Sequence, residues 1–194
     1  MSRILILGGT GHTGRLITRY LLEYSEAAVT IATRHTDKAQ ALAEELNQQY
    51  SGLRAAVVYA DAADVESLRA AFRDQTLVVV AAPTTVNAEI VVHAALETCV
   101  DYLDVQLGTK KFLLLQSLAG EIEHAERCFI TEAGFHPGLP SALVRYAAAN
   151  LDTIESAITA GYLNMGKDLP YTEAVDELIE SFKGYQGQVY KNNQ

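Results

Sequence analysis

The sequence predicts an α/β fold built on a doubly wound parallel sheet. Three observations predict it. Short apolar segments alternate with stretches that are long enough for helices, as in successive β-α-β units. The segment 77–81 is apolar throughout, which is typical of a strand that helices cover on both faces. The intervening stretches each carry one apolar stripe at helical spacing, so they are suited to cover such a sheet.

Five strands and the helices between them are expected in the first 105 residues. The strand segments are short and either apolar or β-branched. They are residues 4–7, 29–33, 55–59, 77–81 and 102–105. The helical stripes between them consist of Leu16, Ile17, Tyr20, Leu21 and Tyr24, of Ala39, Leu42, Ala43 and Leu46, of Val65, Leu68 and Phe72, and of Ile90, Val91, Ala94 and Ala95.

Three further elements complete a first domain, which we place at residues 1–150. They are a helix at about 110–125, a strand at 128–131 and a helix at about 140–150. Residues 151–194 offer one strand, at 154–163, and one amphipathic helix, at about 172–182. These two elements are too few to bury a core alone. We therefore expect residues 151–194 to begin a second, incomplete domain, and the chain to be a fragment of a longer protein.

Composition excludes several classes of function. The 194 residues are 49% hydrophobic and 20% charged, which is an ordinary globular composition. A formal charge of -9 without a basic cluster argues against nucleic-acid binding. The longest apolar stretch, 77–82, is far shorter than the roughly 18 residues of a membrane helix, and the N-terminus lacks the features of a signal peptide. We expect a cytoplasmic protein that does not bind membranes, in which Cys99 and Cys128 are buried free thiols.

A glycine-rich loop joins the first strand to the first helix. It reads Gly8-Gly9-Thr10-Gly11-His12-Thr13-Gly14. Between a strand and an amphipathic helix, such glycines allow a tight turn, close approach of a pyrophosphate and close helix packing. Free N–H groups at the helix N-terminus then favour an anion. The loop predicts a dinucleotide-binding Rossmann domain in which these seven residues contact the cofactor. His12 and Thr13 would line the phosphate or nicotinamide side, although His12 is equally well explained as loop filler.

Arg34 indicates which dinucleotide binds. It follows the second strand, at the position where NAD-preferring domains place an acid against the ribose hydroxyls. A guanidinium instead forms bidentate, charge-assisted bonds to a 2′-phosphate, so NADP is favoured over NAD. Thr33 and His35 would add donors. The alternative is that Arg34 is a solvated surface residue.

Two further strand ends would line the same cofactor. Asp61 and Ala62 follow the third strand, where Asp61 would accept from the adenine amino group or cap the next turn. Ala81, Ala82 and Pro83 end the fourth strand, and their small side chains leave room for ribose and nicotinamide beyond the carboxyl edge of the sheet.

Other catalytic patterns are absent from the sequence. None of the ten tyrosines begins a Tyr-x-x-x-Lys pair, and no G-x-S-x-G elbow occurs. His124 and Cys128 are four residues apart and would share a helix face, but two ligands without a third do not make a metal site. We therefore expect no metal.

Two later motifs add a family resemblance. They are Tyr102-Leu103-Asp104-Val105 and the loop Ala133-Gly134-Phe135-His136-Pro137-Gly138-Leu139. Together with the glycine loop, Arg34 and the 81–83 strand end, they resemble the saccharopine dehydrogenase (reductase) family over about residues 3–150. The resemblance implies an NADP-binding Rossmann domain followed by an α+β domain that supplies dimerisation and most of the substrate site.

The same resemblance implies catalytic candidates and a change of substrate. Tyr102, Asp104 and the loop at 134–139 would border the nicotinamide. His136 stands where saccharopine-forming enzymes usually have Asp, and Gln106 where an acid is often expected, so the substrate would differ. His136 would donate a proton during hydride transfer or pack under the ligand. Asp104 would orient a substrate ammonium or cap the next helix.

Two functions from different classes follow from these observations. The first is a saccharopine dehydrogenase-like, NADP-dependent oxidoreductase that moves hydride to or from a carbonyl, imine or secondary-amine carbon of a small molecule. The second is a non-catalytic NADP sensor of the NmrA-like kind, which acts through partners. A structural subunit with an empty glycine loop is a weaker third. A homodimer is expected from the family.

Overall fold

The computed structural model describes residues 1–106, 108–135, 138–162, 175 and 179. Strands and helices alternate along most of this length. In chain order they are β1 (Arg3–Leu7), α1 (His12–Tyr24), β2 (Ala28–Thr33), α2 (Thr36–Gln49), β3 (Ala55–Tyr59), α3 (Val65–Phe72), β4 (Leu77–Val80), the 3-10 turn η1 (Thr85–Asn87), α4 (Ala88–Glu97), β5 (Asp101–Asp104), α5 (Thr109–Ser117), α6 (Ala119–His124), β6 (Phe129–Ile130) and α7 (Gly138–Ala148).

The strands form one parallel sheet in the order β3-β2-β1-β4-β5-β6. In the centre, Ile4 of β1 lies opposite Val29 of β2 on one side and Leu77 of β4 on the other. The chain therefore builds the sheet outward from β1 in one direction and then returns to continue from β4 in the other. This reversal leaves a crevice at the carboxyl ends of β1 and β4, where open sheets bind ligands. The predicted doubly wound α/β fold is confirmed.

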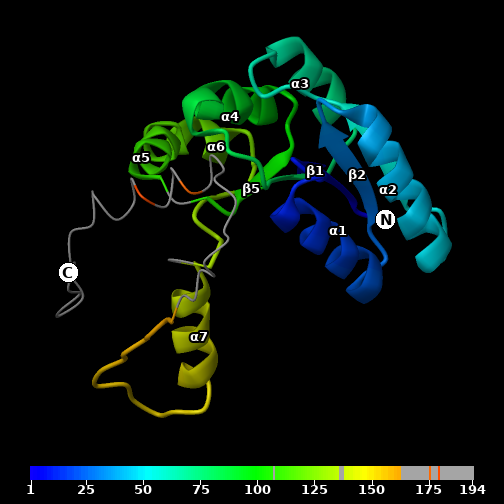
Figure 1. The fold of residues 1–194 in the computed structure, drawn as a ribbon. Coiled ribbons are helices and arrows are strands. Elements are labelled where there is room, and N and C mark those ends of the chain that lie inside the picture. Colours follow the sequence, from blue (N-terminus) through cyan, green and yellow to red (C-terminus); the bar gives the residue numbers. More distant parts are fainter. Residues whose placement is uncertain (107, 136–137, 163–174, 176–178, 180–194) are drawn as a thin grey trace.

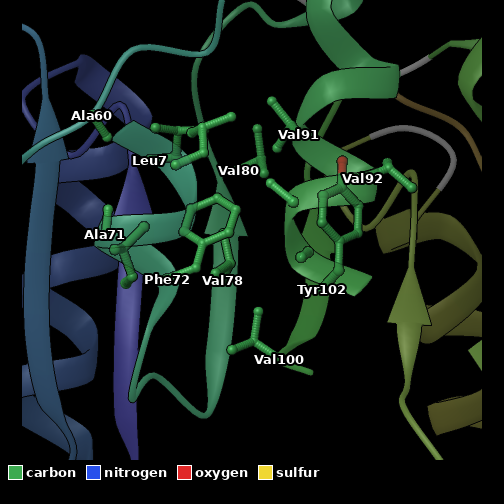
Figure 2. Packing of buried hydrophobic residues seen from close by; sticks show 14 of the residues in the cluster. Leu7, Ala60, Ala71, Phe72, Val78, Val80, Val91, Val92, Val100 and Tyr102 are labelled. Carbon is green, nitrogen blue, oxygen red and sulfur yellow. The ribbon is translucent and has the colours of Figure 1, made fainter. Parts of the chain in front are cut away.

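Two hydrophobic clusters, one on each face of the sheet, hold the helices in place. Successive side chains of a strand point to opposite faces. In β1, Leu5 and Leu7 belong to the cluster under α3 and α4, whereas Ile4 and Ile6 belong to the cluster under α1 and α2. Figure 2 shows the first of these clusters, where Phe72 of α3 packs close to the sheet. Each large side chain that is fully buried in this way contributes about 1.5–3 kcal/mol.

Some predicted elements differ from the structure. The single helix expected at 110–125 is two helices, α5 and α6, that meet at Leu118. Leu118 has φ −92° and ψ 3°, and its side chain lies in the core, so the chain changes direction where that side chain is anchored. The strand expected at 128–131 shrinks to the two residues of β6, which pairs only with β5 at the edge of the sheet.

The strand predicted at 154–163 is wrong for the residues that are described. Residues 154–162 have no strand structure and are exposed. Among the described residues no neighbouring strand pairs with this segment, and an extended segment needs such a partner to be stable. Leu163 and most of the helix predicted at 172–182 lie outside the described residues. Within α7 no residue is buried, and Figure 1 shows this helix standing away from the sheet.

The cysteines also differ from expectation. Cys99 and Cys128 are free thiols, as predicted, but both are exposed rather than buried. Cys99 lies in the turn after α4 with a φ of 55°, and Cys128 directly precedes the short edge strand β6, so neither residue is inside a helix or strand that faces the core. In the part of the chain that the structure describes, no helix is both long and apolar enough to cross a membrane.

Candidate functional site

A cavity of about 350 Å³ lies at the carboxyl edge of the sheet, over the reversal point between β1 and β4. Its walls come from the last residues of the first two strands and from the segments that follow the first four strands. They are Leu7, Gly8, Thr10 and Gly11 at the end of β1 and beyond it, Ala32, Thr33, Arg34 and His35 at the end of β2 and beyond it, Ala60, Asp61 and Ala62 after β3, and Ala81, Ala82, Pro83, Thr84, Val86 and Asn87 after β4. Four stretches that are distant in sequence therefore meet at one site.

The glycine loop turns tightly, and Gly8 and Gly14 are packed against backbone so closely that neither has room for a side chain. Gly8 has a φ of +84°, a conformation that glycine adopts readily. A Cβ atom on Gly8 would lie 2.6 Å from the Cβ of Ala82, across the crevice. A Cβ atom on Gly14 would lie 2.3 Å from the carbonyl oxygen of Gly8. The loop is thus folded under the start of α1, and the backbone of Gly8 approaches the end of β4.

The helix α1 begins at the end of this loop, and no side chain of the described residues accepts a hydrogen bond from the backbone N–H groups at its N-terminus. Gly11 is the N-cap residue, no side chain caps the helix, and its first turn has no acid. The free N–H groups and the positive end of the helix dipole therefore favour an anion. This cradle of backbone N–H groups fits a pyrophosphate. Of the predicted loop contacts, Gly8, Thr10 and Gly11 line the cavity, whereas Gly9, His12, Thr13 and Gly14 do not.

Arg34 lines the cavity directly after β2, as do its neighbours Thr33, which ends the strand, and His35. The Arg34 side chain is exposed. Within the described residues its guanidinium has no hydrogen-bond or ion-pair partner, so all of its donors remain open to a ligand. Thr33 is buried, and its hydroxyl accepts from the backbone N–H of His35 at 3.2 Å and lies 3.3 Å from the hydroxyl of Thr10. Thr33 therefore ties the end of β2 to the glycine loop.

The third and fourth strand ends lie where the sequence places them. Asp61 and Ala62 line the cavity. The Asp61 carboxylate accepts from the backbone N–H of Ala63 at 3.0 Å, as the turn-capping alternative expects, and its contact with adenine stays a prediction. The small side chains at 81–83 all line the cavity. Thr84 and Val86, which sequence reasoning missed, line it too. Both residues follow Pro83 within three positions, beyond the end of a buried strand. This position was the sequence feature that could have predicted their place at the cavity.

The catalytic candidates Tyr102 and Asp104 are buried below this edge and do not line the cavity. Tyr102 is part of the core and stacks on Phe129, with ring centroids 5.4 Å apart. Its hydroxyl donates to Oδ2 of Asp104 at 3.0 Å. Burial, and then the neighbouring Asp104 carboxylate, raises the pKa of Tyr102 above its ordinary value. The direct catalytic roles of these two residues stay predictions.

Asp104 instead forms a buried ion pair with Lys111. The distance from Nζ to Oδ1 is 2.7 Å, and the two side chains are 3% and 0% exposed. The alternative that Asp104 caps the next helix is not met, because α5 begins after Gly108 without a side-chain cap. Sequence reasoning missed Lys111. A lysine in the first turn of a helix is unfavourable, because its charge and the N-terminal end of the helix dipole are both positive. Its place in the sequence was therefore an available indication that an acid lies nearby.

The loop after β6 is fixed against the end of β5. The Asp104 carboxylate accepts from the hydroxyl of Thr131 at 2.8 Å and from the N–H of Glu132 at 3.3 Å. A Cβ atom on Gly134 would lie 2.2 Å from the carbonyl oxygen of Val105, so only glycine fits there. His136, the candidate proton donor, lies outside the described residues.

Potential metal ligands are scattered. Among the described residues, no three His, Cys, Asp or Glu side chains are grouped as a metal ion requires. His124 is the last residue of α6, so it does not share a helix face with Cys128, contrary to the sequence-based expectation.

Comparisons with known proteins agree with this geometry. Residues 4–129 match the family model described as saccharopine dehydrogenase NADP binding domain. This match confirms the predicted family resemblance and NADP as the predicted cofactor. A comparison with curated protein sequences finds no match.

Three solved structures share the fold. Saccharopine dehydrogenase (L-Glu forming) from Saccharomyces cerevisiae is 23% identical with a TM-score of 0.63 over 77% of this chain and 31% of its own. Pen from Bacillus thuringiensis is 16% identical with a TM-score of 0.54 over 67% of this chain and 50% of its own. Triphenylmethane reductase from Citrobacter sp., in complex with NADP(H), is 21% identical with a TM-score of 0.50 over 65% of this chain and 48% of its own. The chain thus spans a third to a half of the length of these proteins.

Proposed function

Because the chain belongs to the family of saccharopine dehydrogenase NADP-binding domains, we propose that it is the cofactor-binding part of an NADP-dependent oxidoreductase. The reaction is hydride transfer to or from a carbonyl, imine or secondary-amine carbon of a small molecule. The full activity requires substrate-binding residues from the remainder of a longer protein, since the chain spans only 31% of the saccharopine dehydrogenase that it resembles in fold.

One observation carries this proposal. A single cavity is lined both by the glycine loop and by Arg34, which are separated by about twenty residues of α1 and β2. In this proposal the free backbone N–H groups in the first turn of α1, beyond Gly11, would hold the pyrophosphate. Arg34 would pair with the 2′-phosphate, because a free guanidinium binds phosphate through two parallel hydrogen bonds.

The remaining walls suit the other parts of the dinucleotide. Asp61 and Ala62 would border the adenine, and the short side chains at 81–83 leave space for the nicotinamide ribose. The bound cofactor supplies or accepts the hydride. The chain's own residues bind, orient and shield it. His136 stays the predicted proton donor.

Arg34→Ala tests the cofactor assignment. We expect the parent chain to bind NADPH more tightly than NADH, because only NADPH offers a 2′-phosphate to the guanidinium. Loss of charge-assisted bonds of about 1.5–3 kcal/mol should weaken NADPH binding by about ten- to a hundredfold and leave NADH binding nearly unchanged. Fluorescence titration measures both affinities.

Arg73→Ala is the matched control for this test. Arg73 is exposed and follows α3, at the opposite edge of the sheet from the cavity. Its removal should leave both affinities as they are. Equal affinities of the parent chain for NADPH and NADH would contradict the assignment of Arg34.

A non-catalytic NADP sensor of the NmrA-like kind is the second candidate. The described cavity residues after β4 favour it, because none of them has a titratable side chain. NADPH oxidation in the presence of small carbonyl and imine compounds separates the two functions. A sensor binds NADPH and oxidises none, whereas the oxidoreductase in its full-length form turns over at least one substrate class.

A further inference from the structure

We propose that Lys111 is a positioning residue for the nicotinamide end of the cavity and acts through Gln106 and Thr84. The inference rests on the proposed function, since it concerns how the same cavity holds its ligand. Three steps connect Lys111 to the cavity wall.

The first step is the buried ion pair of Lys111 with Asp104. Both side chains are almost fully excluded from water, and their charged atoms are 2.7 Å apart. Asp104 also accepts from the hydroxyls of Tyr102 and Thr131. A buried carboxylate with this many donors is held in one geometry, because breaking any of these bonds leaves a polar or charged group with one partner fewer in an apolar medium.

The second step fixes the backbone of Gln106. Its N–H donates to Oδ1 of Asp104 at 3.0 Å, and its carbonyl oxygen accepts from Nζ of Lys111 at 3.4 Å. Both polar backbone groups of Gln106 are therefore bound by the two members of the ion pair. Gln106 lies just beyond the end of β5, so the pair determines where the chain goes as it leaves the sheet.

The third step reaches the cavity. The Thr84 hydroxyl donates to Oε1 of Gln106 at 3.0 Å, and both residues are buried. Thr84 lines the cavity, and its carbonyl oxygen accepts from the N–H of Asn87 at 2.9 Å. Thr84 thereby sets the turn η1, which brings Val86 and Asn87 to the same wall.

This arrangement explains why a cation is buried at an edge that binds an anionic ligand. Asp104 already neutralises Lys111, and the Lys111 side chain is 3% exposed. Lys111 therefore serves the chain by fixing Gln106, and it does not serve as a phosphate ligand. Its removal should disturb the wall at Thr84 and leave the phosphate end at Gly11 and Arg34 intact.

Two ligands distinguish the ends of the cavity. NADPH occupies both ends, whereas 2′-phospho-ADP-ribose lacks the nicotinamide and occupies only the phosphate end. Thr84→Val removes the hydroxyl at nearly constant volume. We expect it to weaken NADPH binding about five- to tenfold and to leave binding of 2′-phospho-ADP-ribose within twofold, as befits the loss of roughly one hydrogen bond. Thr84→Ser, which keeps the hydroxyl, should recover most of the NADPH affinity.

Lys111→Met should reproduce the selective loss of Thr84→Val, with a change in the emission of bound NADPH. Equal weakening of both ligands, or no weakening of NADPH in either variant, overturns the inference. If Lys111→Met does not fold, Lys111→Arg takes its place: it keeps a charge for Asp104 but moves the donor away from the Gln106 carbonyl oxygen, so it should show the same selective loss. A parent chain that binds neither ligand refutes the proposed function itself, so the two failures are distinguishable.

Discussion

Gly14 and Gly120 both lie inside helices, yet the structure places opposite demands on them. A Cβ atom on Gly14 would lie 2.3 Å from the carbonyl oxygen of Gly8 and 2.7 Å from the Cα of Gly9, which are backbone atoms that cannot move aside cheaply. A Cβ atom on Gly120 would meet nothing within 4 Å. The same chemical change, glycine to alanine, therefore tests whether the loop under α1 is as tightly packed as its geometry indicates.

Gly14→Ala should lower the free energy of unfolding by about 1–3 kcal/mol, as overpacked sites do, and should weaken NADPH binding because the loop must shift. Gly120→Ala should raise the free energy of unfolding by about 0.5–1 kcal/mol, since alanine loses less backbone entropy in a helix. Urea denaturation measures both changes. Equal effects of the two variants would show that the Gly8–Gly14 contact is not close.

Tyr102 gives a prediction about alkaline pH. Burial and the Asp104 carboxylate raise the pKa of Tyr102 in the folded chain. In the unfolded chain the hydroxyl ionises near pH 10. The stability that the neutral hydroxyl contributes is therefore complete below about pH 10 and falls as the pH rises further, because only the unfolded chain then releases the proton.

Tyr102→Phe should reduce this loss. The variant should be less stable than the parent at pH 8, by about 1 kcal/mol for the missing hydrogen bond to Asp104. Its unfolding free energy should then decline less steeply between pH 9 and 11. Urea denaturation across this range gives both slopes, and parallel slopes for variant and parent would refute the assignment.

At the scale of single elements, α3 shows how a helix start is encoded locally. The Asp64 carboxylate accepts from the N–H groups of Glu66 at 3.0 Å and of Ser67 at 3.3 Å. This N-cap satisfies donors that the helix cannot satisfy itself. The helix α1, by contrast, has no side-chain cap at all. The helix α3 is thus capped by its own sequence, whereas α1, whose N-cap Gly11 lines the cavity, is one of several helices that are not.

Asp64→Ala should lower the free energy of unfolding by about 1 kcal/mol, because two N–H groups lose their acceptor. Asp64→Asn is the matched control, since the amide oxygen retains the capping bond, and it should cost only a few tenths of that amount. Thermal and urea unfolding measure the difference. NADPH affinity should be the same in both variants, because Asp64 does not line the cavity.

At the scale of the whole molecule, the cavity depends on less than half of the chain. Its lining residues lie between Leu7 and Asn87. The helix α7 and the described residues after it contribute none of them. The cavity is thus built by the sheet with its covering helices, while apolar residues of α7, such as Leu143 and Tyr146, are exposed.

A chain shortened to residues 1–150 should therefore bind NADPH within about twofold of the affinity of the full 194 residues. Fluorescence titration of both lengths measures this, and circular dichroism verifies that the shortened chain is folded. A loss of affinity in a folded 1–150 chain would show that residues 151–194 take part in the site.

Sedimentation equilibrium of both lengths also tests the predicted homodimer, which the family resemblance implies.

Predictions from sequence succeeded where the signal is local. The strand segments 4–7, 29–33 and 55–59 match β1, β2 and β3 within one residue, because a β-branched or apolar run between turn residues has few alternatives. Arg34 was placed at the cavity because a residue that ends a parallel strand must lie at the carboxyl edge. The strand at 154–163 failed because a strand needs a partner, which local sequence does not provide.

The sequence by itself determined the doubly wound sheet, the glycine turn and the position of Arg34, since each follows from backbone geometry and residue period over short distances. Only the tertiary structure decided that Tyr102 and Asp104 are buried and that Lys111 lies against them. Those facts depend on which side chains meet after the strands have paired and the helices have packed. The hydrogen-bond and ion-pair partners of such charged and hydroxyl side chains are set by that final packing. They therefore cannot be read from any single position of the sequence.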